Sequence, residues 1–393
     1  MSSKSQPADS TSLVFTGDIG FDKYMDGRWK DEKLLSSEIR AFLRSADNII
    51  ANVEGPLGHP GQFSATSGTE QLKHTMSEEV ADFLDSIGVD IWNLCNNHIM
   101  DAGPEGLENT LRIAREHGVR TIGVGMNITD AKEPVIIRKA GGIGMIGVGY
   151  QRACRAASDT KGGCFPWNDM TAISEQISKI KKECRWCVIV SHAGEEFTAL
   201  PSPYTRERYL EYLRMGADVV VCHHPHVPMN YELVGDKAIF YSLGNFIFDT
   251  DYQRSQFNTE KGILLKLMFT EDSFTFEAMG LRIVRGPETI EKATLPDIFE
   301  DIREDEFKLL SPLSVKMFIA ATKRQLRYLK PDEFKDATEE KWMSNFTEPL
   351  RSGRVPGETL DLPILLPIAA EAEKGDWKKS KHKKVVDYIL AQM

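Results

Sequence analysis

The sequence contains no apolar run that approaches the roughly 20 residues needed to span a bilayer as a helix. It also lacks an excess of positive charge, because 58 acidic residues outnumber 48 basic ones and give a formal net charge of −10. Nucleic acids and anionic membranes attract basic surfaces, so neither is expected as the main partner. A site that binds an anion must therefore obtain its positive charge locally, for example from metal ions.

Cysteine is scarce as well, with six residues scattered along 393 positions. Scattered cysteines in a long chain fit a reducing compartment better than a disulfide scaffold. Residues 1–12 are polar and rich in serine, and they contain no apolar segment of the kind that a signal peptide needs. We therefore expect a disordered segment at residues 1–12 and a cytoplasmic protein, or an extracytoplasmic one if a leader has been trimmed.

The most informative stretch is residues 219–227, in which an apolar, β-branched strand runs into three histidines. Strands that are apolar at every position are typical of parallel sheets covered on both faces. Clefts in such sheets form at the carboxyl ends of the strands. Neutral imidazoles are good ligands for divalent transition metals, so this turn is a candidate metal site.

Strands and helices alternate along most of the chain, which predicts a layered α/β fold. Five apolar segments are predicted as strands that run into polar turns, namely residues 13–16, 48–53, 89–94, 187–191 and 219–222. Beyond residue 290 the composition becomes rich in Glu and Lys, and helices are predicted at 297–310, 314–329 and 331–345. We therefore predict a domain at residues 13–290 and a helical appendage at 291–393, which offers a surface for a protein partner.

Potential metal ligands stand at the ends of these five strands. They are Asp18, Glu54, Asn97, His192, His224 and His226. One parallel sheet would bring such strand ends to a common edge, and this mixture of carboxylate, amide oxygen and imidazole suits Mn, Fe or Zn. Six ligands suit two ions, and a pair about 3.5 to 4 Å apart can activate water and stabilise charge on a phosphoryl or carbonyl oxygen. Taken singly, these residues have plainer explanations, such as a turn aspartate for Asp18 and a structural histidine for His98.

Six short motifs occur in order between residues 13 and 250. They are Gly17-Asp18, Asn52-Val53-Glu54-Gly55-Pro56-Leu57, Asn96-Asn97-His98 with Asp101, His192-x-Gly194-x-Glu196, His223-His224-Pro225-His226-Val227 and Tyr241-Ser242-Leu243-Gly244-Asn245-Phe246. In this set the chain resembles the CapA or poly-γ-glutamate capsule-synthesis family of the calcineurin-like metallophosphoesterase superfamily. The resemblance implies a layered β-sandwich flanked by helices, with two divalent metal ions as cofactors.

The resemblance also implies a role for each site residue. Glu54 would bridge the two metals, Asp18 and His226 would complete one of them, and Asn97, His192 and His224 would complete the other. His98 would act as general acid beside the metals, and Glu196 would join it in catalysis or contact the substrate. Asn52, His223 and Asn245 would support the ligands or contact the substrate.

Four positions depart from the pattern that the resemblance implies. Superfamily phosphatases usually begin with Asp-x-His, whereas the third position here is Gly20, so the first metal lacks one protein ligand. Ala193 replaces an aromatic residue of the family, and Thr205 and Met229 replace two glutamines. The ligand set remains, but the family's usual substrate is put in doubt.

These features lead to three hypotheses about function. The first is a metal-dependent hydrolase that acts on a phosphoester or an amide-linked acidic polymer, so that small molecules, peptides and acidic polymers are the candidate substrates. The second is an accessory protein of capsule or polymer synthesis, which holds a polymer end without turnover. The third is a metal-dependent peptide epimerase on the same scaffold, an analogy at the level of the family.

Overall fold

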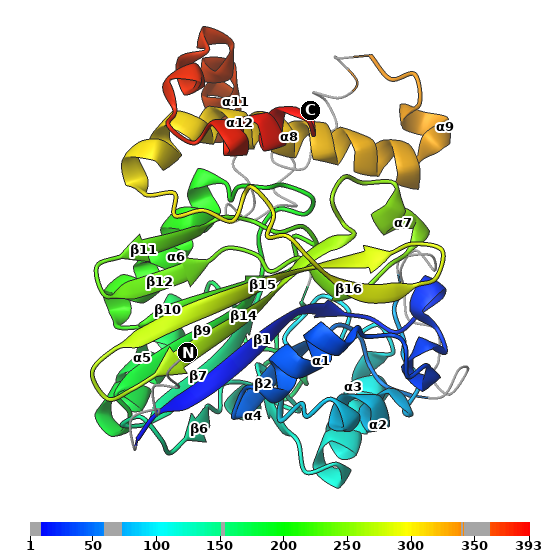
Figure 1. The fold of residues 1–393 in the computed structure, drawn as a ribbon, viewed down its shortest axis with the longest axis vertical. Coiled ribbons are helices and arrows are strands. Elements are labelled where there is room, and N and C mark those ends of the chain that lie inside the picture. The colour runs from blue at the N-terminus through cyan, green and yellow to red at the C-terminus, as the bar shows by residue number, and fades with distance from the viewer. Residues whose placement is uncertain (1–8, 59–72, 151–153, 339–340, 342–361) are drawn as a thin grey trace.

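The computed structural model describes residues 9–58, 73–150, 154–338, 341 and 362–393. Two β-sheets form a sandwich, helices cover both outer faces, and the C-terminal helices lie across one end of the sandwich (Figure 1). This arrangement confirms the expected layered α/β fold with a helical C-terminal region.

The first sheet has eight strands among the described residues. In spatial order they are β16 (Thr289–Ala293), β15 (Phe274–Val284), β14 (Lys261–Phe269), β1 (Thr11–Ile19), β2 (Asn48–Val53), β3 (Ile91–Asn93) and β4 (Arg120–Ile122), and β13 (Asn245–Ile247) pairs with β1. Strands β1 to β4 run parallel, whereas β14 to β16 are antiparallel to their neighbours. Thr11 and Ser12, which were expected to be disordered, pair with β14, and residues 1–8 lie outside the described residues.

The second sheet has six described strands. In spatial order they are β11 (Tyr231–Val234), β12 (Lys237–Phe240), β10 (Val219–His223), β9 (Trp186–His192), β7 (Ile143–Gly149) and β6 (Val135–Ile137). The four central strands are parallel, and both edge strands are antiparallel. Strands β6 and β7 form an antiparallel pair at one edge of this sheet.

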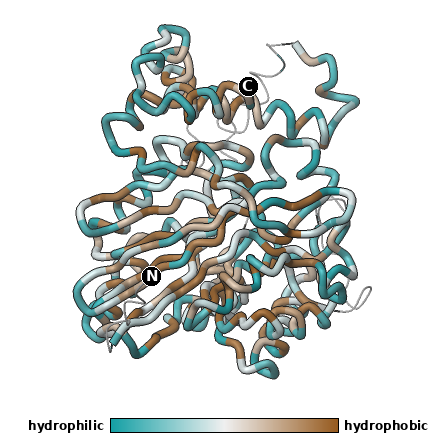
Figure 2. The backbone as a smooth tube through the Cα atoms, viewed as in Figure 1, coloured by the Kyte–Doolittle hydropathy of each residue, from teal (hydrophilic) through white to brown (hydrophobic). Residues whose placement is uncertain are grey.

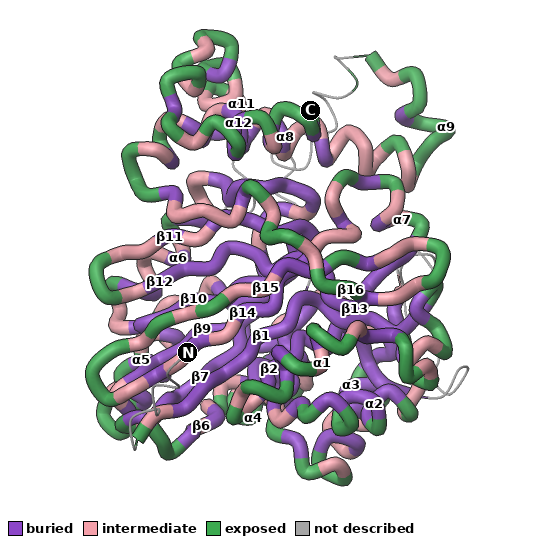
Figure 3. Tube along the Cα trace, in the orientation of Figure 1, coloured by how far each residue is buried: buried purple, intermediate pink, exposed green. Residues whose placement is uncertain are grey.

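Strand β10 illustrates why an apolar residue stands at every position. Val219 and Val221 pack in the core between the two sheets, whereas Val220 and Cys222 pack against the helices outside. Successive side chains of a strand point to opposite faces, so a strand that is covered on both sides needs apolar residues throughout. The central strands β1, β9 and β10 are accordingly apolar at most positions (Figure 2) and buried throughout (Figure 3).

Helices cover the outer face of each sheet. Helices α1 (Ser37–Arg44), α2 (Val80–Ser86) and α3 (Gly103–Glu116) cover the first sheet, and α5 (Met170–Glu183) and α6 (Pro203–Met215) cover the second. The bounds of α6 follow from its sequence, because Ser202 caps its first turn and Gly216 ends it with a positive φ of 118°. The shorter elements are η1 (Lys23–Met25), η2 (Arg28–Lys30), β5 (Val124–Gly125), α4 (Ile128–Ala131), β8 (Gly163–Cys164) and α7 (Asp251–Arg254).

The C-terminal region contains one long helix and several short ones. They are α8 (Glu304–Leu329), α9 (Pro331–Phe334), α11 (Leu362–Glu371), η4 (Ala372–Lys374), η5 (Asp376–Lys379) and α12 (Lys383–Leu390). Two helices were predicted at 297–310 and 314–329, but α8 continues through Pro312. Burial of Leu310 and Leu313 on either side of the proline offsets the hydrogen bond that the proline removes. Of the third predicted helix, residues 339–340 and 342–345 lie outside the described residues.

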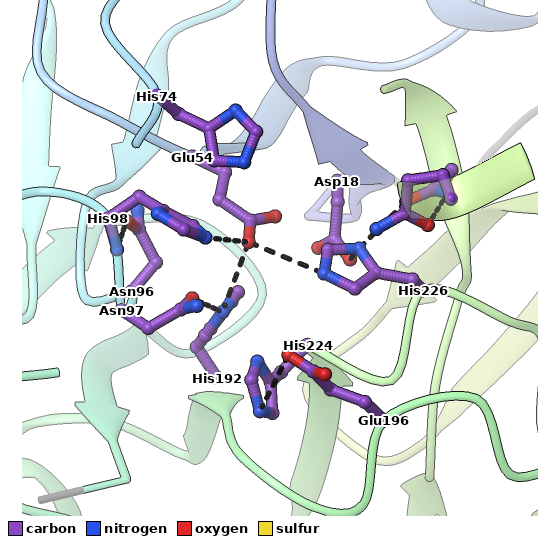
Figure 4. A network of polar contacts seen from close by, with 12 residues as sticks. Asp18, Glu54, His74, Asn96, Asn97, His98, His192, Glu196, His224 and His226 are labelled. Carbon is purple, nitrogen blue, oxygen red and sulfur yellow. Dashed lines mark hydrogen bonds and ion pairs between the residues drawn. The ribbon is translucent and has the colours of Figure 1, made fainter. Parts of the chain in front are cut away.

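The expectation that one parallel sheet gathers all five strand ends is wrong. β1, β2 and β3 belong to the first sheet, and β9 and β10 belong to the second. A continuous apolar strand is equally compatible with a sheet between two layers of helices and with one half of a sandwich. The strand ends still meet, because the parallel strands of both sheets end at the same edge of the sandwich (Figure 4).

Candidate metal centre

The six candidate ligands gather where the two sheets meet. Three follow the first sheet and three the second, namely Asp18 in β1, Glu54 after β2, Asn97 after β3, His192 at the end of β9, and His224 and His226 after β10. Glu54, Asp18 and His192 have no exposed surface, and His224 and His226 are 6% and 2% exposed. These five ligands are therefore buried beneath the edge of the sandwich and are not exposed on its surface.

Glu54 is the centre of this cluster. Its Oε1 atom lies 3.6 Å from His192 Nε2, 3.7 Å from His226 Nε2 and 3.9 Å from His98 Nε2. Neither carboxylate oxygen has a hydrogen-bond partner among the described residues. Burial therefore raises the pKa of Glu54 well above its usual range. A buried carboxylate without partners is costly unless a cation compensates its charge, so the site fits bound metal.

Asp18 and His226 lie on one side of Glu54. Ligand atoms of these three residues lie within 4.8 Å of one another. His226 Nδ1 lies 3.2 Å from Asp18 Oδ2, and Asp18 Oδ2 has no hydrogen-bond partner among the described residues. Burial opposes protonation of His226, but the carboxylates of Glu54 and Asp18 outweigh it and raise the pKa of His226 to about 10. Without metal, a proton on His226 therefore compensates part of the negative charge.

Asn97, His192 and His224 lie on the other side of Glu54. Asn97 Oδ1 is 2.8 Å from His192 Nε2, and the rings of His192 and His224 are 4.9 Å apart. Burial and the neighbouring histidines lower the pKa of His192 far below its usual value and that of His224 to about 3. Both imidazoles are therefore neutral at physiological pH, which is the form that binds metals.

Glu196 offers one further carboxylate on this side. Its Oε1 atom lies 4.0 Å from His224 Nε2, and Glu196, His224 and His226 form a second group with ligand atoms within 4.8 Å of one another. Its other oxygen accepts a hydrogen bond from Gln325 Nε2 at 2.6 Å. The position of Glu196 suits a ligand or a substrate contact.

The histidine turn after β10 adopts an unusual backbone. His224 has a φ of 96° and His226 a φ of 58°, in the left-handed region that favours glycine. Such conformations cost roughly 1 to 3 kcal/mol each and persist where the surrounding structure enforces them. Here the strained turn places the His226 imidazole against Glu54 and the His224 imidazole against Glu196, which is consistent with a functional turn.

The three residues expected in supporting roles have distinct contacts. Asn52 Nδ2 donates to Asp18 Oδ1 at 2.9 Å, and Asn245 Oδ1 lies 3.0 Å from His226 Nδ1. His223 Nε2 lies 2.8 Å from the backbone oxygen of Thr16, so this ring links the two sheets. All three are buried, and Asn52 and Asn245 contact candidate ligands directly, as expected of residues that hold ligands in position.

His98 is held in place by Asp101. Its Nδ1 atom lies 2.7 Å from Asp101 Oδ2, and its Nε2 atom points toward Glu54 (Figure 4). Burial and the neighbouring His74 lower the pKa of His98 to about 4, so the ring is neutral at physiological pH. A carboxylate only accepts hydrogen bonds, so the proton of the neutral ring stays on Nδ1 and Nε2 is free to accept another.

His74 is a site residue that the sequence analysis missed. Its Nδ1 atom lies 2.6 Å from Asp22 Oδ2, and its ring meets that of His98 edge to face with centroids 4.2 Å apart. Asp101 Oδ2 also accepts a hydrogen bond from the backbone N–H of His74 at 2.9 Å. Neither His74 nor Asp22 belongs to a motif or follows a strand directly, so only their residue types could have drawn attention to them.

Phe248 fills the space beside Gly20, where superfamily phosphatases carry a histidine. A Cβ atom at Gly20 would lie 2.4 Å from the Phe248 ring. The same ring stacks on His226, with centroids 4.9 Å apart and an interplanar angle of 29°. The space that a histidine at position 20 would occupy is therefore filled by the Phe248 ring.

A cavity of about 290 Å³ lies beside the ligands. Asn97, His98, Glu196 and His226 contribute to one wall. The opposite wall comes from helix α8, through Thr322, Gln325, Leu326 and Leu329. Helix α8 of the C-terminal region thus lines the cavity beside the candidate ligands.

The protein is thus a layered α/β sandwich with a cluster of candidate metal ligands at one edge. The sequence pattern of the bacterial capsule synthesis protein PGA_cap family matches residues 12–250, which is more than half of the chain. The chain belongs to this family, which is part of the metallophosphoesterase-like superfamily. The resemblance that the motifs carry is thereby confirmed.

Curated relatives show the same relationship. The PGA biosynthesis protein CapA of Bacillus subtilis is 28% identical over 258 residues, which cover 64% of this chain and 67% of that protein. The capsule biosynthesis protein CapA of Bacillus anthracis is 28% identical over 225 residues, which cover 56% and 54%. A probable polyglutamine synthesis accessory protein of Mycobacterium tuberculosis is 21% identical over 217 residues, which cover 52% and 56%. The aligned part is about half to two thirds of the length of these relatives.

Two further observations complete the comparison. A crystal structure of a hypothetical protein from Thermus thermophilus is similar with a TM-score of 0.41 and 13% identity, over 68% of this chain and 99% of that one. A similarity this low supports no conclusion about fold or function. None of the helices in the described ranges combines the length and the apolar character needed to cross a membrane.

Proposed function

We propose that this protein is a metal-dependent hydrolase that binds two divalent ions and acts on a phosphoester or an amide-linked acidic polymer such as poly-γ-glutamate. Glu54 would bridge the ions, with Asp18 and His226 on one ion and Asn97, His192 and His224 on the other. Carboxylate, amide oxygen and imidazole favour Mn, Fe or Zn. When bound, such a pair polarises a phosphoryl or carbonyl oxygen and acidifies water.

One observation carries this proposal: both oxygens of the fully buried Glu54 carboxylate lack hydrogen-bond partners among the described residues, and Oε1 lies within 3.9 Å of three imidazole nitrogens. A buried carboxylate with a purely structural role would accept hydrogen bonds from side chains or from backbone N–H groups. The names of the curated relatives connect the family with capsule and polyglutamate synthesis, which supports an acidic polymer as substrate.

His98 would move protons during the reaction. The Asp101 contact leaves the bare Nε2 atom facing the cavity, so the ring would first accept a proton and then return it to the leaving group. This order differs from the simple general acid that the resemblance implies, because the pKa of about 4 leaves no second proton on the ring at neutral pH. His74 and Asp22 would hold the ring of His98 in position.

Two variants test the division between ligands and proton transfer. We expect His226→Ala to lower the metal content of protein purified without chelator. His98→Ala should keep the metal content and lower turnover by about 10² to 10⁴, the usual contribution of general acid–base catalysis. Elemental analysis and assays on phosphomonoesters, phosphodiesters and γ-glutamyl peptides measure both effects. Full metal content in His226→Ala would contradict the ligand assignment.

A second candidate function is that of an accessory protein in polymer synthesis, which binds a polymer end without cleaving it. The name of the Mycobacterium tuberculosis relative favours this function, because that protein is called a probable polyglutamine synthesis accessory protein. In this case a protein partner would contact the C-terminal helices. Metal-loaded protein that binds γ-glutamyl peptides, cleaves none of the tested esters or amides, and is retained by the synthesis machinery would favour this function over hydrolysis.

A further inference from the structure

We propose that helix α8 closes one side of the metal site, so that the pocket admits the end of an amide-linked chain and excludes a continuous stretch from its interior. This inference rests on the proposed function for the ligand class. It concerns a part of the chain beyond residues 12–250, which the family pattern matches.

The first argument is that one face of α8 lines the cavity. Thr322, Gln325, Leu326 and Leu329 all border it. Their spacing is i, i+3, i+4 and i+7, which places four side chains on the same side of a helix. A face with this regular spacing is a wall of the pocket and not an incidental contact.

The second argument is that α8 is attached to the site residues themselves. Gln325 Nε2 donates to Glu196 Oε2 at 2.6 Å, and the Tyr252 hydroxyl lies 3.5 Å from the same oxygen. Ala321 is buried in a cluster with Phe197 and Val227, which directly follow Glu196 and His226 in the sequence. The wall is therefore joined to the two loops that supply Glu196 and the histidine turn.

The third argument is that the rest of α8 is fixed as well. Ser314 Oγ lies 3.0 Å from the backbone oxygen of Leu200 and 2.9 Å from that of Pro201. Nearer the C-terminal end of the helix, Arg324 Nη1 donates to the backbone oxygen of Gln392 at 2.8 Å. Because α8 is held along its length, the wall is built into the fold.

The size of the cavity then limits the ligand. Its volume of about 290 Å³ is at the lower end of the ~300 to 1,000 Å³ typical of sites for drug-sized ligands. A polymer that passed through the site would need a second opening on the side of α8. Leu326 and Leu329 occupy that side. A chain end needs only one opening.

The chemistry of the lining points to neutral amide groups on the ligand. Gln253, Gln325 and Thr322 offer amide and hydroxyl groups that both donate and accept hydrogen bonds. Among the described residues that line the cavity there is no lysine or arginine. These groups fit the amide links of the chain, and the charge that compensates its terminal carboxylate would come from bound metal.

The test uses the full chain loaded with manganese and two probes with the same eight residues, a linear octamer of γ-linked glutamate and the octamer cyclised head to tail, which lacks the two chain ends. Binding is measured by calorimetry, and products are measured by mass spectrometry in parallel. We expect the linear octamer to bind and the cyclic one to bind at least about tenfold more weakly, a difference of about 1.4 kcal/mol. If the linear chain is cleaved, single residues should be released first.

Variants of α8 test the cause of this selectivity. The double variant Leu326→Ala with Leu329→Ala removes the apolar part of the wall, and the cyclic octamer should then approach the affinity of the linear one. Leu295→Ala is the control, because this leucine lies outside α8 and is 42% exposed. It should leave the difference between the probes unchanged.

The possible outcomes separate this inference from the proposed hydrolase. Binding of the linear octamer without cleavage supports the pocket and counts against hydrolysis. Equal binding of both octamers, internal cleavage of the linear one, or no binding of either overturns the inference.

Discussion

Among single residues, Glu54 and His226 would couple the proposed metal binding to pH. The pKa of His226 is about 10 in the metal-free site, so this imidazole carries a proton at pH 7 to 9. Only the neutral ring binds a metal, and the proton must therefore leave when the ion binds. The proton that compensates the buried carboxylates is replaced by the ion.

We therefore predict that metal binding releases at least one proton and that the apparent affinity rises with pH. With one linked proton, the dissociation constant should fall about tenfold per pH unit between pH 7 and 9. Calorimetry with Mn²⁺ in two buffers of different ionisation enthalpy measures the number of protons. Identical binding enthalpies in both buffers would contradict the protonated state of His226.

A second prediction concerns Gly20 and Phe248. Gly20→His alone should destabilise the protein by about 1 to 3 kcal/mol, because the new side chain collides with the Phe248 ring. Combined with Phe248→Ala, it should restore the missing ligand and bind the first metal at least about tenfold more tightly, or about 1.4 kcal/mol. The φ of Gly20 is not positive, so its backbone accepts a side chain.

Equilibrium dialysis with Mn²⁺ and thermal unfolding measure these two effects. Phe248→Ala alone is the control for the cavity that the smaller side chain leaves. If the double variant binds Mn²⁺ no more tightly than this control, the position of Gly20 relative to the first metal is not the one described.

Site residues could be predicted from the sequence only where a motif marked them. The motifs placed Asp18, Glu54 and the histidine turn at strand ends, and the structure brings them together. His74 and Asp22 carry no such mark, because they reach the site through loops whose course the sequence does not specify. The contact of His223 with the backbone of Thr16 also depends on how far apart the two sheets lie, and no local sequence pattern reports that distance.

Among the elements, α8 is the one whose docking should be most sensitive to a single hydroxyl group. Ser314 is buried and contacts two backbone oxygens of the loop after β9, whereas Ser311 Oγ donates to Lys308 within the helix. We predict that Ser314→Ala destabilises the docked helix by about 1 to 3 kcal/mol, since buried acceptors lose their donor. Ser311→Ala should have little effect.

Hydrogen exchange of α8 and thermal unfolding measure this difference. Faster exchange along α8 in Ser314→Ala, with slow exchange retained in the strands, is the expected result. Equal protection of α8 in both variants would mean that the helix is held by its apolar contacts alone.

The elements also show which parts of the fold the sequence predicts. Strands β1, β2, β9 and β10 were predicted within a few residues, because alternate burial on two faces requires an uninterrupted apolar run. Helix α8 was divided in two because Pro312 is a local breaker, while the packing of Leu310 and Leu313 that offsets it is tertiary. Local patterns therefore predicted elements better than their continuity.

At the scale of the whole molecule, the sequence pattern could not predict which strands belong to which of the two sheets. Residues of β1 and β10 face each other across the interior of the sandwich, although every residue of both strands is as buried as in a single covered sheet. The pairing of two sheets depends on contacts between residues about 200 positions apart, such as His223 and Thr16. Only the family resemblance implied the sandwich.

The whole molecule also unites regions that composition separated. The change in composition near residue 290 predicted a helical appendage, and α8 of that region lines the cavity beside the candidate ligands and contacts Glu196. Substrate selection should therefore depend on the C-terminal region as well as on the family domain.

The most direct test of the central claim is anomalous X-ray diffraction from crystals soaked in Mn²⁺, with data collected on both sides of the manganese absorption edge. The account predicts two peaks about 3.5 to 4 Å apart, bridged by Glu54, with Asp18 and His226 at one peak and Asn97, His192 and His224 at the other. No peak beside Glu54, or metal bound only at the surface, would contradict it.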